Sequence, residues 1–210
     1  MSKAQNPLTG QMSGSMANFV TTTHGKQNVI RSKAFNPRNA NTKPQQLQRG
    51  GFKLLGEEYK NLSGLPELSF PEVPETQSAY GLFMAANLSG AIIRNETEPA
   101  IDYSQLIVAN GSLPDVFVDG GIITAEGISV SYKTNVLLPN ENGTDQVWAI
   151  LRKRSGELVV AKQARGGEEV GTILIPIAGI QAADVKFCYV FMLNADGSKA
   201  SKSTYIPFGN

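Results

Sequence analysis

The chain has 210 residues, with 19 basic and 18 acidic side chains and a hydrophobic content of 41%. That hydrophobic content is enough for at least one folded core. The single cysteine, Cys188, excludes an intramolecular disulfide, and no apolar run approaches the roughly 18 residues of a membrane-spanning helix. The opening residues MSKAQNPLTGQMSGS contain no apolar stretch typical of a secretory signal, so we expect cytoplasmic synthesis.

Positive and negative charges are unevenly distributed along the chain. Residues 1–60 contain nine basic and two acidic residues, a net charge of +7, whereas the other 150 residues contain ten basic and sixteen acidic ones, a net charge of −6. This asymmetry indicates either an anionic partner for the basic segment or head-to-tail association between copies. An ordinary solvated surface is the competing explanation.

The first regular element expected is a β-hairpin over residues 18–32, because β-branched residues flank a polar turn at His24-Gly25-Lys26. The Asn- and Pro-rich residues that follow disfavour regular structure. Thr42, Pro44 and Gln45 then form a pattern typical of a helix start. We expect a helix over about residues 43–60 whose buried side carries Leu47, Leu54, Leu55 and Tyr59.

Gly50 and Gly51 lie in the middle of this expected helix. Each glycine costs about 1 kcal/mol relative to alanine, so we expect another element to pack closely against the helix backbone there. Residues 62–75 contain three prolines and are expected to form a connector. A second helix is expected over about residues 76–88, with Tyr80, Phe83 and Met84 facing a core.

From about residue 101 the sequence consists of short apolar runs separated by turns, at the spacing typical of a β-sandwich. GISVSYKT alternates, which predicts that Ile128, Val130 and Tyr132 point inward. Ser155-Gly156 and Asp196-Gly197 predict hairpin turns. The expected strands are SQLIVA, GIITA, GISVSYKT, QVWAILRKR, ELVVAKQ, VGTILIP, VKFCYVFML and KSTYIPF.

These elements predict an α+β protein with two domains. Residues 1–100 would form a basic N-terminal region with an irregular arm, a β-hairpin, two helices and a Pro-rich connector. Residues 101–210 would form an antiparallel sandwich of immunoglobulin or fibronectin type III type without a disulfide. Trp148 would lie on its third strand and Cys188 on its penultimate strand.

The residues that usually perform catalysis are scarce. His24 is the only histidine and lies in a turn, while Cys188 lies in an apolar strand, where a buried structural role is favoured over a nucleophile. One histidine and one cysteine also do not supply the usual zinc ligand set. The sequence contains no recognisable cofactor motif. We therefore expect a non-enzymatic protein without catalytic residues, metal or cofactor.

The N-terminal third resembles an uncharacterised bacterial family of domains of unknown function. The resemblance is carried by NPLTGQMSGSMANFV, by GKQNVIRSKAFNP, and by the pattern of Thr42, Gln45, Gln48 and Arg49. The chain departs from the family pattern at Ala40, Asn41 and Lys43, where Pro, Arg and Pro are usual. The resemblance implies a helical stretch followed by a C-terminal immunoglobulin-like domain, and a gene context compatible with phage-derived or particle-assembly proteins. It implies no activity.

The leading functional hypothesis is a structural or interaction protein that takes part in an assembly. Its basic N-terminal region would dock on another protein subunit or on a second copy of the chain, which could be incorporated into a larger particle. A second hypothesis is nucleic-acid binding through the same region, and a third is a carbohydrate-binding sandwich. The candidate interaction residues are Lys26, Arg31, Lys33, Arg38, Arg49 and Lys53.

Overall fold

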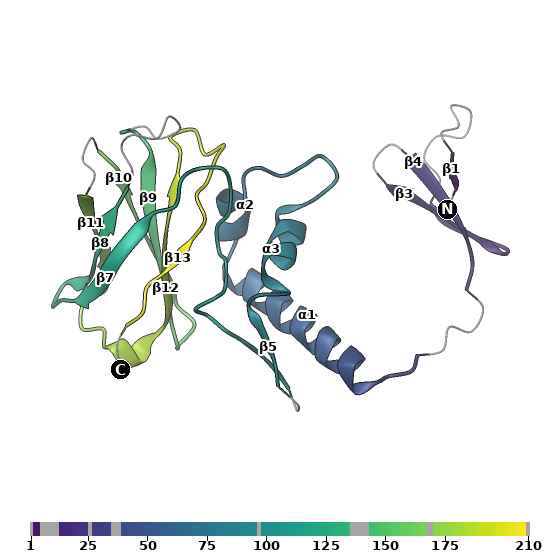
Figure 1. Ribbon diagram of the computed structural model, residues 1–210, viewed down its shortest axis with the longest axis horizontal. Coiled ribbons are helices and arrows are strands. Elements are labelled where there is room, and N and C mark those ends of the chain that lie inside the picture. Colours follow the sequence, from purple (N-terminus) through teal and green to yellow (C-terminus); the bar gives the residue numbers. More distant parts are fainter. Residues whose placement is uncertain are drawn as a thin grey trace. The chain divides into compact units, whose positions relative to one another are not determined.

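The computed structural model describes most of the chain, and its contacts divide it into two compact units (Figure 1). The N-terminal unit comprises residues 1–43 and 74–77, and the C-terminal unit comprises residues 44–73 and 78–210. The described residues are 2–4, 13–24, 27–34, 39–95, 98–134, 143–166 and 170–208.

The N-terminal unit contains a four-stranded antiparallel sheet in the order β1-β4-β3-β2. Its central pair, β3 and β4, is the expected hairpin, with Phe19 opposite Ser32 and His24 opposite Gln27. The predicted turn residues Gly25 and Lys26 lie outside the described residues. The hairpin is therefore confirmed, but two further strands extend it into a sheet. The strands are β1 (Ser2–Ala4), β2 (Gly14–Met16), β3 (Phe19–His24) and β4 (Gln27–Ser32).

The C-terminal unit begins with three helices: α1 (Lys43–Asn61), α2 (Leu65–Ser69) and α3 (Ala79–Asn87). The first and last are the two helices expected from the sequence. The short helix α2 corrects the expected connector over residues 62–75. Gly64 adopts a left-handed conformation (φ 81°) before this helix, and Pro66 is tolerated because it lies in the first turn.

Two antiparallel sheets complete this unit. A four-stranded sheet has the order β10-β9-β12-β13, and a three-stranded sheet has the order β11-β8-β7. A small hairpin of β5 and β6 lies outside them. The strands are β5 (Ile92–Arg94), β6 (Pro99–Ile101), β7 (Phe117–Ile123), β8 (Gly127–Lys133), β9 (Gln146–Lys153), β10 (Leu158–Ala164), β11 (Val170–Pro176), β12 (Val185–Leu193) and β13 (Thr204–Tyr205).

The four-stranded sheet is covered on both faces (Figure 1). One face carries Phe187 and Phe191 of β12, which pack in a cluster with Leu55 of α1 and Phe83 of α3. The other face carries Cys188 and further side chains that pack against the three-stranded sheet. In that sheet Ile128, Val130 and Tyr132 of β8 point into the core, as their alternation predicts. The unit therefore has three layers, with helices on one side and two sheets behind them.

Residues 104–109, SQLIVA, do not form the expected strand. The segment is buried at Leu106 and Val108, but polar side chains satisfy its backbone in place of a neighbouring strand. Asn87 binds both the amide and the carbonyl of Ile107, and Ser69 donates to the carbonyl of Val108. An apolar run bounded by polar residues thus lies in the core as an irregular segment, because buried asparagine and serine side chains supply its hydrogen bonds.

Gly50 and Gly51 of α1 lie close to the β5–β6 hairpin, as expected from their position in the middle of the helix. A Cβ atom at Gly50 would lie 2.8 Å from Cγ of Pro99, and one at Gly51 would lie 3.2 Å from Cγ2 of Ile92. The absence of side chains at these two positions lets the hairpin approach the helix backbone. A third glycine, Gly56, has more space, since its Cβ would lie 3.4 Å from the Tyr80 hydroxyl.

This difference gives a matched pair of substitutions. Helix propensity alone predicts that glycine to alanine stabilises by about 1 kcal/mol at either position. We expect Gly56→Ala to raise the free energy of unfolding by up to about that amount. Gly50→Ala should instead lower it by about 1 kcal/mol or more, because the new methyl group overlaps the Pro99 ring. Urea unfolding of both variants tests this, and equal stabilisation would contradict the close contact.

Candidate interaction surfaces

The basic residues expected to mediate interaction are distributed over both units. Arg31 is the penultimate residue of β4 and Lys33 directly follows the strand, and both are exposed. Arg49 and Lys53 lie four residues apart on α1 and are also exposed, and Lys53 Nζ lies 3.9 Å from Glu57 Oε1. The remaining two, Lys26 and Arg38, lie outside the described residues. The structure thus brings together Arg31 with Lys33 and Arg49 with Lys53, as two separate pairs.

The N-terminal sheet contains little apolar material of its own. Phe19 is 54% exposed, and Val20, Val29 and Ile30 are only partly buried. Among the described side chains of this sheet, the only two that are buried are polar: Thr21 and Asn28. The two apolar clusters formed by the described residues contain no residue before Leu55. A sheet of this size needs an apolar face or a packed partner for stability, and the described side chains of this sheet form only a partly buried apolar face.

A second exposed surface is the outward face of the three-stranded sheet, which we call the outer sheet face. Ile122 of β7 and Leu174 of β11 both pair with Ser129 of β8, on the side that points away from the core. Phe117 and Val170 pair in the same way with Lys133 at the other end of the sheet. Two apolar residues on each edge strand thus flank the small and polar side chains of β8.

The four apolar residues of the outer sheet face are well exposed. Ile122 is 68% and Phe117 is 65% accessible, while Val170 and Leu174 are 52% and 41% accessible. Single exposed apolar side chains are common, but a set that shares one sheet face is typical of an interaction site. The nearest charged pair is Lys133 with Asp119, whose Nζ and Oδ2 atoms are 3.2 Å apart. This face combines an apolar surface with few local charges.

A buried charge cluster joins α1 to the four-stranded sheet. Glu58 of α1 is 3% exposed, and its carboxylate accepts hydrogen bonds from Arg152 Nη1 at 2.7 Å and Lys186 Nζ at 3.2 Å. The Tyr103 hydroxyl donates to the same carboxylate, at 3.3 Å, and Lys186 lies over the Tyr103 ring. Burial raises the pKa of the Tyr103 hydroxyl above its ordinary value. The cluster fixes the helix to the sheet at one defined position.

A β-bulge directs Lys186 into this cluster. Val185 pairs with Lys153 and Phe187 pairs with Arg152, so Lys186 is an extra residue between two paired positions. The bulge shifts the alternation of β12, because Val185 and Cys188 both face the core between the sheets. Lys186 therefore points to the helix side with Arg152. The alternation of side chains along a regular strand does not predict this change of facing at the bulge.

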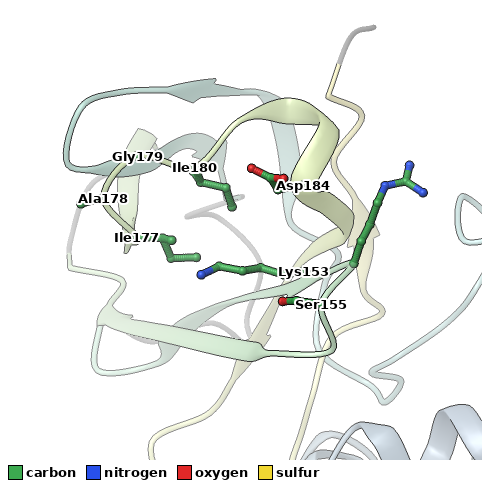
Figure 2. Close-up of a pocket in the computed structure, with 8 residues that line it drawn as sticks. Lys153, Ser155, Ile177, Ala178, Gly179, Ile180 and Asp184 are labelled. Carbon is green, nitrogen blue, oxygen red and sulfur yellow. The ribbon is translucent and has the colours of Figure 1, made fainter.

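Next to this cluster, the turn between β9 and β10 is lined by cations. A cavity of about 210 Å³ is bounded by Arg152, Lys153, Arg154, Gly156 and Lys186. A neighbouring cavity of about 170 Å³ shares Lys153 and Arg154, and Figure 2 shows Lys153 extending across it toward Ile177, with Ile180 and Asp184 on the opposite side. None of these residues is among those that the sequence predicts to mediate interaction. The run Arg152-Lys153-Arg154 at the end of an expected strand was the available signal.

Cys188 is fully buried in β12, as its apolar neighbours predict. Burial raises the pKa of its thiol well above the ordinary value, so the reactive thiolate is disfavoured at neutral pH. His24 is the last residue of β3, in the N-terminal unit. Among the described residues, no group of three or more His, Cys, Asp and Glu side chains is placed to hold a metal ion.

The burial of Cys188 gives a direct solution test. We expect a thiol reagent such as 5,5′-dithiobis(2-nitrobenzoate) to react with the native protein at least about 100-fold more slowly than with the urea-unfolded chain, because reaction requires opening of the core. The absorbance of the released thiolate measures both rates. Comparable rates in the two states would show that β12 is accessible in solution.

The described helices include none that is long and apolar enough to cross a membrane. The architecture defined by these elements is a mixed α+β fold that consists mostly of antiparallel strands. A family model described as a family of unknown function, DUF6266, matches residues 11–207. The chain belongs to this family, which confirms the resemblance seen in its N-terminal third. Searches of curated proteins and of solved structures each gave no match.

Proposed function

We propose that this protein is a non-catalytic interaction protein that associates with further copies of itself to build an assembly. The observation that carries the proposal is the outer sheet face, on which Phe117, Ile122, Val170 and Leu174 stand exposed on two strands that flank β8. Leaving such a set in water is unfavourable, and its burial against a partner recovers hydrophobic free energy.

The occupant that we propose for this face is the N-terminal unit of a second copy. Six basic residues and one acidic residue give the N-terminal unit a net charge of +5, whereas 13 basic and 17 acidic residues give the C-terminal unit a net charge of −4. Opposite charges on the two units favour contact between copies and disfavour contact between like units. Phe19, which is 54% exposed on the N-terminal sheet, supplies an apolar contact.

A contact between different surfaces of successive copies is heterologous, and such contacts close into rings or continue as filaments. In this arrangement Arg31 and Lys33 would contribute to the positive side of the contact, together with Lys26 and Arg38. The chain thus has two complementary surfaces for assembly.

Within this proposal we assign the two sheets of the C-terminal unit to the immunoglobulin-like class. The orders β7-β8-β11 and β10-β9-β12-β13 fit a seven-stranded sandwich in which the fourth strand pairs with the third. Trp148 lies on the third of these strands, but it packs with the helix-side cluster and stacks on Phe191. Cys188 lies on the sixth and is a free thiol. Presentation of one sheet face or of loops is a common use of this architecture.

Light scattering coupled to size exclusion tests the proposed association. We expect a mass above that of the 22.5 kDa monomer at high protein concentration and low salt, and a lower mass at high salt, because salt screens the attraction between the units. A monomer under all conditions would overturn the proposal.

Nucleic-acid binding is the second candidate, favoured by the exposed pairs Arg31 with Lys33 and Arg49 with Lys53. A salt-titrated binding assay with single- and double-stranded oligonucleotides distinguishes it from self-association, because phosphate contacts weaken steeply with salt. Binding at low salt with an unchanged oligomeric mass would favour this candidate. The carbohydrate-binding hypothesis stays a prediction.

A further inference from the structure

We propose that the cavity at the β9–β10 turn is a binding site for a phosphate-class oxyanion. Four of its five lining residues are cations: Arg152, Lys153, Arg154 and Lys186. This site is independent of the outer sheet face and of the N-terminal unit. It is built from β9, the following turn and β12 of the C-terminal unit.

The turn and the bulge together explain why Arg152, Arg154 and Lys186 lie around one cavity. Gly156 takes a positive φ of 98°, which closes the tight turn, and its amide donates to the Lys153 carbonyl at 3.0 Å. The Arg154 amide donates to the Asp184 carbonyl, so the turn lies against the start of β12. The bulge there brings Lys186 to the same side of the sheet as Arg152. Residues distant in sequence thus meet around one cavity.

The nearby carboxylates neutralise only part of this positive charge. Glu58 is shared between Arg152 and Lys186, and Glu157 pairs with Lys153, with Oε2 2.7 Å from Nζ. Asp184 lies at the adjoining cavity, where it accepts a hydrogen bond from the Gln181 amide. Glu157 thus neutralises Lys153, which extends across the adjoining cavity. Arg152, Arg154 and Lys186 have only Glu58 between them, so an excess positive charge remains at the turn.

Two cations also have unused donors. Arg154 donates from Nε to the Ala183 carbonyl at 2.9 Å, and within the described part of the chain its guanidinium has no carboxylate partner. Arg152 is 7% exposed, and its buried Nε finds no acceptor among the described atoms. A buried donor without an acceptor is costly, and clustered cations repel one another. An anion bound at the cavity relieves both.

The donor set selects the chemical class of the ligand. Two planar guanidinium groups match the paired oxygens of a phosphoryl group, and lysine adds charge without strict geometry. A cavity of about 210 Å³ exceeds the roughly 30 Å³ that one water occupies, so it can hold a tetrahedral oxyanion with part of its hydration or an attached group. A single carboxylate has less charge and should bind more weakly.

The test is a titration of the full ¹⁵N-labelled chain with inorganic phosphate at constant pH and ionic strength, followed by amide chemical shifts. We expect saturable shifts at residues 153–156 and 184–186, with half-saturation at about 1 mM. Acetate should bind at least about tenfold more weakly, because it carries one charge and two oxygens.

Arg154→Gln should weaken phosphate binding by about tenfold while leaving the fold intact, because this side chain lies outside the buried cluster. Lys202→Gln is the matched control, since Lys202 is exposed and does not line the cavity. The proposal is overturned if shifts do not saturate, if acetate binds as well as phosphate, or if both variants lose affinity equally.

Discussion

Replacing Glu58 with glutamine is expected to lower the free energy of unfolding by about 3 kcal/mol, the largest single effect that the structure predicts for a charged residue. The carboxylate is 3% exposed and holds Arg152 and Lys186 at once. Its removal leaves two cations without their shared counter-charge, one of them nearly buried. Urea unfolding monitored by Trp148 fluorescence measures the loss.

Glu57→Gln is the matched control, because Glu57 is the preceding residue on the same helix. Its side chain is 55% exposed and its pair with Lys53 has a separation of 3.9 Å. A surface pair of this type contributes between about 0 and 1 kcal/mol. The double variant Glu58→Gln with Arg152→Gln should lose less than the sum of the two single losses. If Glu57→Gln and Glu58→Gln lowered the free energy of unfolding by the same small amount, α1 would not be anchored through this cluster.

Replacing Phe117 and Ile122 together with serine is expected to weaken self-association by about 100-fold or more. Each side chain buried in a contact contributes about 1.5 to 3 kcal/mol, so the loss of two exceeds two decades of affinity. Both residues lie on the outer sheet face, at 65% and 68% exposure. Sedimentation velocity over a concentration series measures the change.

Val160→Ser provides the control for this pair. Val160 is 40% exposed on β10, which belongs to the other sheet. Its replacement should leave the association unchanged. Neither set of substitutions should alter stability by more than a few tenths of a kcal/mol per site, because surface residues contribute little to the core. Equal loss of association in both would show a non-specific hydrophobic effect.

Much of the fold was predictable from local patterns. The start of α1 followed from Thr42, Pro44 and Gln45, and the alternation in β8 followed from Ile128 and Val130. These signals are local, since capping and alternation depend on neighbours in sequence. The close approach at Gly50 was also predictable, because two glycines inside a helix are destabilising unless another element packs against the backbone there.

The remaining features depend on contacts between residues far apart in sequence. The residues around Glu58 in the sequence do not distinguish it from an exposed glutamate on a helix. Its burial depends on Arg152 and Lys186, which are 94 and 128 residues away. The irregular course of residues 104–109 depends on Asn87 and Ser69. No local periodicity contains these partners, so the charge cluster and the cavity beside it emerge only from the tertiary structure.

The proposed assembly also explains two features that would be unfavourable in an isolated chain. The N-terminal sheet has Phe19 largely exposed and only partly buried aliphatic side chains. The outer sheet face leaves four apolar side chains in water. A contact between the two surfaces would bury both sets of exposed apolar side chains. The opposite net charges of the two units favour contact between unlike units over contact between like units.

Cross-linking between isotopically distinct copies tests this contact most directly. A mixture of ¹⁴N- and ¹⁵N-labelled chains is treated with an amine-reactive linker and analysed by mass spectrometry. We predict mixed-isotope cross-links between Lys33, which follows β4, and Lys133, which lies between Phe117 and Val170 on the outer sheet face. These cross-links should disappear in the Phe117→Ser/Ile122→Ser variant. Cross-links confined to single chains, or mixed links that survive in that variant, would contradict the assembly.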